Sequence, residues 1–310
     1  MVKLLWGIIK TSRPRQWIKN FAVFAALIFS GNLLDLDALI KTFSAFILFC
    51  AFSSATYMLN DVFDQDRDKL HPFKKRRPIA SGLIPIPLAV GVALLTIAVG
   101  LPLAYKLSPA FFFAALTYLT LQLFYSAYLK QIILIDVLVI AAGFVLRVYG
   151  GVWAIDAHLN VWFLLSVSSF ALFLAIGKRR SERTLMESQA SQHRETLLHY
   201  PENLLDILTS MFANSTWLTY AFFTFLQPPI TARGAILSFL GGFELPLTQA
   251  KYLMATVPVV IYAVMRYLYI IYEKKEGESP ERVILTDKPL LVTVIIWLVM
   301  VIGIIYYLGA

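Results

Sequence analysis

The sequence predicts an all-α protein that crosses a membrane several times, and its composition carries that prediction. Of the 310 residues, 59% are hydrophobic and 15% are charged, whereas a soluble globular chain has about 45–50% apolar and about 25% charged residues. One core cannot enclose this excess, because the surface of a soluble protein of this size still needs polar cover. The single cysteine, Cys50, excludes a secreted disulfide-rich scaffold.

Stretches of about 20 mostly apolar residues are long enough to cross the hydrocarbon of a bilayer. The sequence predicts nine such transmembrane helices, at residues 18–33, 38–60, 84–105, 109–128, 134–155, 159–177, 203–226, 250–272 and 289–308. The first is short and amphipathic at its start. The apolar outer segment 227–248 predicts an interfacial or re-entrant piece. Because no soluble domain or low-complexity linker interrupts the pattern, we expect residues 1–310 to form one transmembrane bundle.

Lys and Arg residues lie mainly in alternate connections between the predicted spans. The exceptions are Lys41, Lys106, Arg147, Arg233 and Lys251. This asymmetry predicts a cytoplasmic N-terminus and an outer C-terminus, and it explains the net charge of +8 without a nucleic-acid partner. We therefore expect a multi-pass protein of the cell (inner or plasma) membrane. Its long, charged inner loops 61–83, 178–201 and 273–288 predict an active site that faces the cytoplasm.

The most distinctive motif follows the second predicted span, where Asn60, Asp61, Asp64 and Asp68 are close in sequence. In a continuous helix Asn60, Asp64 and Asp68 share one face, with Asp61 beside them. Like charges at this spacing repel one another unless a cation lies between them. Oxygen ligands favour Mg²⁺, with Mn²⁺ as the alternative ion. We therefore predict that these four residues bind a divalent cation.

A basic cluster follows the acidic motif within a few residues. Beside a metal site, Lys74 and Arg77 predict a grip on phosphate, because a guanidinium binds oxyanions through two parallel hydrogen bonds. On their own, such residues commonly contact lipid headgroups. The acidic residues by themselves are also compatible with a solvated helix end, with carboxylates paired to Arg67 and Lys69.

Charged residues also occur within or beside the later spans. Asp136 opens the fifth span and Arg147 lies near its middle on the same helical stripe, which predicts that this face lines a polar cavity. The alternative for Arg147 is a structural ion pair with a carboxylate on a neighbouring helix. Lys130 precedes the fifth span. Lys178 and Glu182 follow the sixth span as an i,i+4 pair, which by itself need only support the helix.

The nine spans and the motif Asn-Asp-x-x-Asp-x-x-x-Asp resemble the UbiA superfamily of intramembrane prenyltransferases, in which two Asp-rich motifs bind a prenyl diphosphate through Mg²⁺. Residues 178–182 stand here in the place of the second motif and contain no Asp. The chain is more similar to one branch, the decaprenyl-phosphate phosphoribosyltransferases. The segments that carry this similarity are 13–20, 60–68, 71–72, 74, 77–78, 125–126, 129–130, 136, 143–147, 178–179, 182, 266–267, 277–281 and 287.

The resemblance implies transfer of 5-phosphoribosyl from 5-phosphoribosyl-1-diphosphate to a polyprenyl phosphate. The products are polyprenylphosphoryl-5-phosphoribose, for cell-wall or glycan precursor synthesis, and diphosphate. Asp61, Asp64 and Asp68 are then the catalytic residues and, with Asn60, hold Mg²⁺. The candidates for substrate binding are Lys19, Asn60, Lys74, Arg77, Lys130, Asp136, Arg147, Lys178, Arg179, Glu182 and Arg266.

Two other functions remain open at this point. A conventional UbiA-type prenyltransferase, which moves a prenyl group from a prenyl diphosphate to an aromatic acceptor, would need the missing second Asp-rich motif. A transporter or lipid flippase would show inverted repeats with helices broken at the midplane, whereas the charges here are concentrated at one membrane face. The length of the lipid acceptor and the oligomeric state, including a homo-oligomer, are not determined by the sequence.

Overall fold

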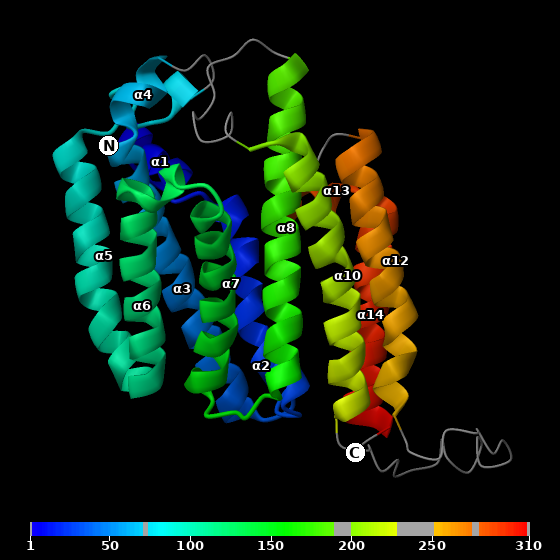
Figure 1. Cartoon of the computed structure of the whole chain (residues 1–310). Coiled ribbons are helices and arrows are strands. Elements are labelled where there is room, and N and C mark those ends of the chain that lie inside the picture. The colour runs from blue at the N-terminus through cyan, green and yellow to red at the C-terminus, as the bar shows by residue number, and fades with distance from the viewer. Residues whose placement is uncertain (1, 71–73, 189–199, 228–250, 275–278, 309–310) are drawn as a thin grey trace, which may run out of the picture. The chain divides into compact units, whose positions relative to one another are not determined.

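The computed structural model describes residues 2–70, 74–188, 200–227, 251–274 and 279–308, and the regular structure in them is entirely helical (Figure 1). This confirms the predicted all-α class. The described residues form two compact units, one ending at His158 and the other beginning at Leu159. The prediction of a single domain over residues 1–310 stays a prediction.

The first unit contains four long helices and several short helical segments. They are α1 (Val2–Thr11), η1 (Pro14–Val23), α2 (Phe24–Phe29), α3 (Leu36–Phe63), α4 (Gln65–Leu70), η2 (Lys74–Arg76), α5 (Ile86–Leu107), α6 (Pro109–Ala127), η3 (Leu129–Gln131) and α7 (Ile135–Ala154). Helix α3 packs against α5, α6 and α7, and α4 continues from one end of α3 (Figure 1). Ser108 alone joins α5 to α6, and its hydroxyl accepts from the Phe111 amide to cap α6.

Aromatic rings and closely approaching backbones hold the first unit together. The Phe49 ring lies edge-on to the rings of Phe111 and Tyr118, with centroids 5.5 Å apart in both pairs. Helix α7 approaches the end of η1 so closely that a Cβ on Gly151 would lie 2.0 Å from the Val23 carbonyl oxygen. Gly151 therefore permits a backbone contact that any larger residue would block.

The second unit contains the remaining helices. They are α8 (Val161–Ser188), α10 (Glu202–Leu226), η4 (Tyr252–Thr256), α12 (Val257–Tyr269), η5 (Ile270–Lys274), α13 (Pro280–Thr286), α14 (Lys288–Ile302) and η6 (Gly303–Leu308). Helix α8 packs along α10, and α12 packs against α10 and α14. The structure corrects the predicted end of the sixth span at residue 177, because α8 continues through residues 178–182 and places them on a helix instead of a loop.

Seven helical segments are long and apolar enough to cross a membrane. They are Leu36–Phe63, Ile86–Leu107, Pro109–Ala127, Ile135–Ala154, Val161–Thr184, Tyr252–Lys274 and Lys288–Leu308. The other two predicted spans correspond to the broken η1–α2 segment and to α10, which has the length of a span but many polar side chains. Nine spans and the inward N-terminus remain predictions. Apart from residue 227, the predicted outer segment 227–248 lies outside the described residues.

Substitution of Gly151 tests the close approach of α7 to η1. Gly151→Ala should lower the free energy of unfolding by about 1–3 kcal/mol, because the added methyl group must push against the backbone of Val23. Thermal unfolding of the purified protein in detergent measures this change. Gly91→Ala in α5 is the matched control, since a Cβ at Gly91 meets nothing within 4 Å. Equal unfolding midpoints for the two variants would contradict the packing.

Candidate active site

The acidic motif lies where α3 ends and α4 begins. Asp64 stands between the two helices, its amide donates to the Asn60 carbonyl over 2.9 Å, and the Asp68 amide donates to the Asp64 carbonyl over 2.8 Å. The chain therefore keeps a nearly helical path through the motif. Asn60 and Asp64 lie on a shared face, because Asn60 Nδ2 donates to Asp64 Oδ2 over 3.2 Å.

Asp61 and Asp68 form the buried part of the motif, with 3% and 4% of their surfaces exposed. The same atom, Arg77 Nη1, lies 3.1 Å from Asp61 Oδ1 and 2.6 Å from Asp68 Oδ2. The structure thus pairs Asp68 with Asp61 instead of aligning it with Asn60 and Asp64, because residues seven apart return to almost the same side of a helix. One guanidinium nitrogen lies between two carboxylates.

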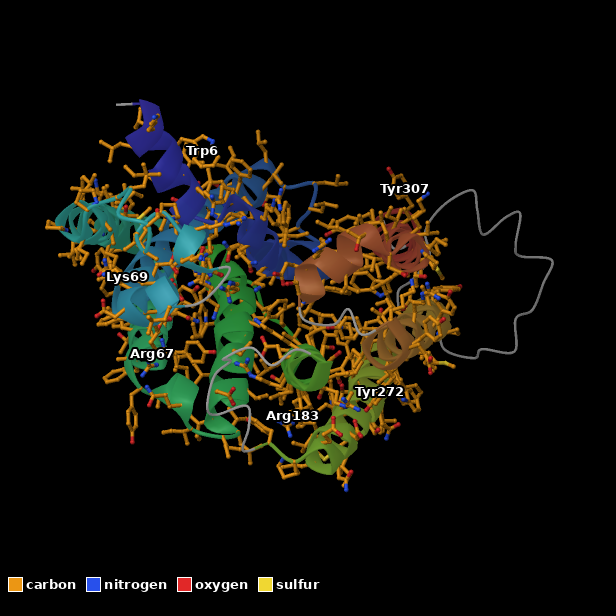
Figure 2. All side chains as sticks on the ribbon, turned by 90° about the horizontal axis from the view of Figure 1, so that it is seen from above. Trp6, Arg67, Lys69, Arg183, Tyr272 and Tyr307 are labelled. Carbon is orange, nitrogen blue, oxygen red and sulfur yellow. The ribbon has the colours of Figure 1, made fainter. Side chains whose placement is uncertain are left out.

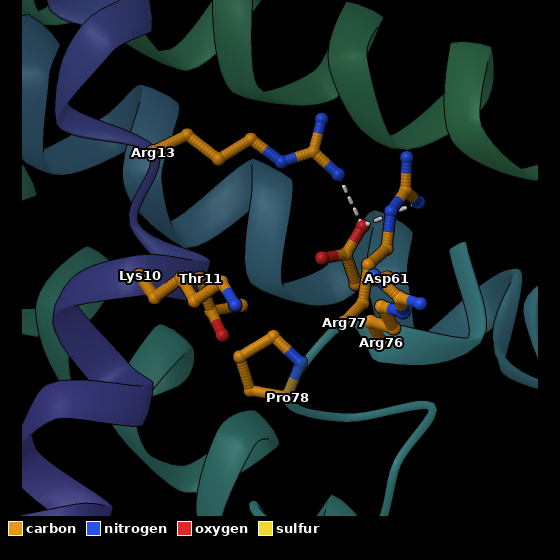
Figure 3. Close-up of a pocket in the computed structure, with 7 residues that line it drawn as sticks. All are labelled: Lys10, Thr11, Arg13, Asp61, Arg76, Arg77 and Pro78. Atoms are coloured by element: carbon orange, nitrogen blue, oxygen red, sulfur yellow. Dashed lines mark hydrogen bonds and ion pairs between the residues drawn. The ribbon is translucent and has the colours of Figure 1, made fainter. Parts of the chain in front are cut away.

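Arg13, which precedes η1, is a second cation on Asp61 and was not among the predicted site residues. Its guanidinium donates to Asp61 Oδ1 (Figure 3) and lies 5.0 Å from the centre of the Tyr57 ring. The backbone of Arg13 is left-handed, with φ 51° and ψ 61°, a conformation that costs a non-glycine residue free energy and that clusters at functional sites. The sequence Arg13-Pro14 does not by itself indicate a left-handed backbone, so it gave no signal that Arg13 belongs to the site.

Lys130, on η3, supplies the cation for Asp64. Its Nζ lies 2.6 Å from Asp64 Oδ1, and only 4% of the Lys130 surface is exposed. Each of the three predicted catalytic carboxylates therefore contacts at least one cation, and the cations Arg13, Arg77 and Lys130 come from three separate segments of the first unit. Of the alternative pairing with Arg67 and Lys69, the structure shows one part, because Lys69 pairs with Asp66 of the same segment. Among the described residues, the ion pairs of Asp61, Asp64 and Asp68 are instead with Arg13, Arg77 and Lys130. Lys19 and Lys74 are half-buried.

The donor set fits a hard divalent cation, because carboxylate and amide oxygens are the ligands that Mg²⁺ prefers. Within the described ranges, no three acidic, histidine or cysteine side chains are close enough to share one metal ion. Asp61 and Asp68 nevertheless already bracket a positive charge, the Nη1 nitrogen of Arg77. The structure thus shows two carboxylates arranged around a cation, with a guanidinium in the position between them.

Arg147 is buried in α7 and contacts neutral groups. Its Nε donates to Asn20 Oδ1 over 2.7 Å, its Nη1 to the Gly143 carbonyl over 2.7 Å, and its Nη2 to the Tyr118 hydroxyl over 2.9 Å. Asn20 is itself fully buried. In place of the alternative ion pair with a neighbouring carboxylate, the structure shows a network that joins η1, α6 and α7. Asp136 is also buried, at the start of α7.

The basic residues after the sixth predicted span lie on α8 in the second unit. Arg179 is 2% exposed and donates to Glu182, and Lys178 Nζ lies 3.7 Å from Glu182 Oε1. Both cations thus face one carboxylate on the same helix. Arg180, which the sequence did not single out, pairs with Asp206 of α10 over 2.6 Å and so ties the two helices together.

Arg266, the last predicted substrate-binding residue, forms a two-pronged ion pair with Asp287. Its Nε and Nη2 lie 3.0 and 2.9 Å from the two Asp287 oxygens, and Lys274 Nζ lies 2.8 Å from Oδ2. Asp287 also caps α14 by accepting from the Leu290 amide over 3.1 Å. The hydrogen bonds from Arg266, and further those from Lys274 and Leu290, hold the pKa of Asp287 well below its usual value. The cluster ties α12 to α14.

These observations define a class: a multi-pass, all-helical membrane protein with a carboxylate-rich site at the end of a long span. The model of the UbiA prenyltransferase family matches residues 20–286. The chain belongs to this family and is a UbiA-family transferase.

Named relatives and a solved structure match nearly the whole chain. A decaprenyl-phosphate phosphoribosyltransferase of Corynebacterium glutamicum is 32% identical over 308 residues, which cover 97% of this chain and 87% of that protein. Its namesake from Mycobacterium tuberculosis is 30% identical over 299 residues, with 95% and 93% covered. The structure of a UbiA homolog from Archaeoglobus fulgidus bound to GPP and Mg²⁺ has a TM-score of 0.66 at 19% identity, covering 96% of this chain and 99% of that one. The resemblance recognised from the motifs is confirmed.

Acid should weaken the cluster around Asp287. Because the folded-state pKa is lowered, the stabilisation is present above the unfolded-state pKa of about 3.9 and is lost as the pH falls through the lower folded-state value. Asp287→Asn should therefore lower the unfolding midpoint at pH 7, and its difference from the wild type should shrink below pH about 4. Asp37→Asn, at an exposed ion pair, is the control. A difference that is independent of pH would contradict the assignment.

Proposed function

We propose that this chain transfers the 5-phosphoribosyl group from 5-phosphoribosyl-1-diphosphate to a polyprenyl phosphate. The observation that carries the proposal is the similarity, at 30–32% identity and nearly full length, to proteins named decaprenyl-phosphate phosphoribosyltransferases. The site supports it, because one group of carboxylates is surrounded by cations from other segments. A donor with phosphate at both ends, together with a phosphorylated acceptor, needs this excess of positive groups.

The acidic residues are assigned to the leaving diphosphate. Asp61, Asp64 and Asp68, with Asn60, would hold Mg²⁺. Their oxygen donors suit that ion, and Asp61 and Asp68 already lie on either side of the Arg77 guanidinium nitrogen. When bound, Mg²⁺ neutralises charge on the diphosphate and so makes it a better leaving group. The carboxylates would also stabilise positive charge on the ribose ring as the bond to C1′ breaks.

The reaction needs no general base. The bond between C1′ and the diphosphate oxygen breaks, and its electron pair leaves with diphosphate. An oxygen of the lipid phosphate attacks C1′ from the opposite face and inverts that centre. A phosphate monoester is largely ionised at neutral pH, since its second pKa is about 6. The contribution of Arg13, Arg77 and Lys130 is then to position phosphates and to offset their charge.

The other predicted substrate-binding residues remain part of the proposal, and they lie in different parts of the structure. Lys19, Lys74 and Asp136 belong to the first unit, where Asp136 is buried and the two lysines are half-buried. Arg147 is also proposed to bind phosphate, which requires it to give up hydrogen bonds that it now makes to neutral groups in exchange for bonds to phosphate oxygens. The remaining assignments to substrate binding lie in the second unit; they are Lys178, Arg179, Glu182 and Arg266.

Transfer of label from phosphoribosyl diphosphate into the organic phase tests the function directly. The purified protein in detergent with Mg²⁺ and a polyprenyl phosphate should form a labelled lipid, and EDTA should abolish the product. Asp64→Asn should lower the rate about 100-fold or more, because a carboxylate at the leaving group is lost. Asp66→Asn is the matched control, since the Asp66 side chain is 96% exposed and contacts Lys69.

The alternative function has its own readout in the same preparation. If several polyprenyl phosphates accept no label while a prenyl diphosphate is consumed with an aromatic acceptor, the chain is a conventional prenyltransferase. The structural likeness to the homolog bound to GPP supports the fold alone, so it does not favour this alternative.

Metal binding without turnover tests the assignment of Asp61 and Asp68. Arg77→Gln should raise the affinity for Mn²⁺ in the absence of donor about tenfold or more, because the cation between the two carboxylates is removed. Electron paramagnetic resonance of free Mn²⁺ measures this affinity. Arg67→Gln is the control, at an exposed cation on α4 (Figure 2). Unchanged or weaker Mn²⁺ binding in folded Arg77→Gln protein would contradict the assignment of both carboxylates as metal ligands.

A further inference from the structure

A second feature of the first unit, beside the acidic motif, is a pocket of about 220 Å³ between α1 and the segment around η2 (Figure 3). Four cations and the carboxylate of Asp61 line the pocket. Lys10 and Arg13 come from the end of α1 and the residues after it, and Arg76 and Arg77 come from the end of η2. Of these four cations, only Arg77 is among the residues that the sequence predicts to bind substrate.

The pocket carries more positive charge than its carboxylate can offset. Arg13 and Arg77 both contact Asp61, and Arg77 also contacts Asp68. Neither Lys10 nor Arg76 has an acidic partner in the part of the chain that the structure describes; Lys10 Nζ lies 5.1 Å from the centre of the Trp6 ring. Two exposed cations that line one pocket and have no acidic partner among the described residues favour an anion there.

Helix α1 indicates where that anion comes from. Gly7 and Ile8 pack against the protein beside Ile84. Trp6 and Ile9 are each 59% exposed, and α1 lies at the outer edge of the first unit (Figure 2). At about 15 Å, a ten-residue helix is too short to cross the hydrocarbon.

An amphipathic helix of this kind lies in the membrane interface, with its apolar side chains in the lipid. Lys3 and Lys10 near its two ends suit the headgroup level. Lys10 lies in the last turn of α1 and lines the pocket. An interfacial α1 would therefore bring the pocket to the depth where lipid phosphates lie. A soluble phosphate would have to reach the same place from the aqueous side.

We propose that this pocket binds a phosphate monoester, and that its occupant is the phosphate of the polyprenyl phosphate acceptor. The identity of the occupant rests on the proposed function. Lys10 and Arg76 neutralise the lipid phosphate, and the apolar face of α1 accompanies the first isoprene units of its chain. Arg13 and Arg77 separate this phosphate from the carboxylates of Asp61 and Asp68, which would otherwise repel it.

The kinetic test titrates the two substrates separately in the full-length protein. Lys10→Gln and Arg76→Gln should each raise the KM for polyprenyl phosphate about tenfold, with kcat and the KM for phosphoribosyl diphosphate within about twofold of the wild type. Lys3→Gln and Lys75→Gln are matched controls, because each removes one exposed lysine from the same helical segment, α1 or η2, without lining the pocket. The controls should leave all three constants unchanged.

A binding test separates this proposal from the function on which it rests. Wild-type protein without donor should bind a polyprenyl phosphate more tightly than the polyprenol of equal length, and the double variant of Lys10 and Arg76 should lose that difference. Inorganic phosphate should compete weakly.

Each other outcome has a definite meaning. A rise in the KM for the donor, or strong competition by inorganic phosphate, would assign the pocket to a soluble phosphate and overturn the lipid proposal. Equal effects of the matched lysine controls would reduce the result to general attraction to anionic membranes and would also overturn it. A wild-type protein that binds the lipid phosphate through these residues yet transfers no phosphoribosyl group would contradict the proposed function and leave the phosphate site standing.

Discussion

The pairing of buried carboxylates with cations from distant segments is the interaction on which the site depends. Asp61 and Asp68 lie almost out of contact with solvent, and an uncompensated charge in such a position costs several kcal/mol. Arg77 offsets both of them through one nitrogen, and Arg13 adds a second cation to Asp61. This need for neutralisation draws η2 and the start of η1 onto the end of α3.

The same charges explain how one site can be stable alone and still suit substrates rich in phosphate. In the structure, the cations and carboxylates neutralise each other. In the proposed reaction, a divalent ion would take over the carboxylates, and the guanidinium and ammonium groups would become available to phosphate oxygens. The left-handed backbone of Arg13 fits this picture, because strain of that kind persists where surrounding contacts hold a functional side chain in place.

The buried cation Arg147, in contrast, is stabilised by neutral hydrogen-bond partners. Arg147 has no carboxylate among its described contacts and is satisfied by the amide of Asn20, the hydroxyl of Tyr118 and a backbone carbonyl. Asn20 in turn donates to Cys50 Sγ and to Ser53 Oγ of α3, each over 3.2 Å. This network spans four helical segments, so it fixes η1 at the height from which Arg13 reaches Asp61.

The helices of this protein and the location of its acidic site were predictable from the sequence, because both depend on local properties. A run of about 20 apolar residues must be helical in lipid, where backbone groups have no other partner, and the spacing of Asn60 and Asp64 places them on one face in any helix. Which cation meets which carboxylate was decided by tertiary structure. Arg13 and Asp61 are 48 positions apart and Lys130 and Asp64 are 66 apart, so their pairing depends on how helices pack. Helix packing depends on the shapes of the contacting surfaces, as at Gly151 against Val23. The periodicity of the sequence does not predict such contacts.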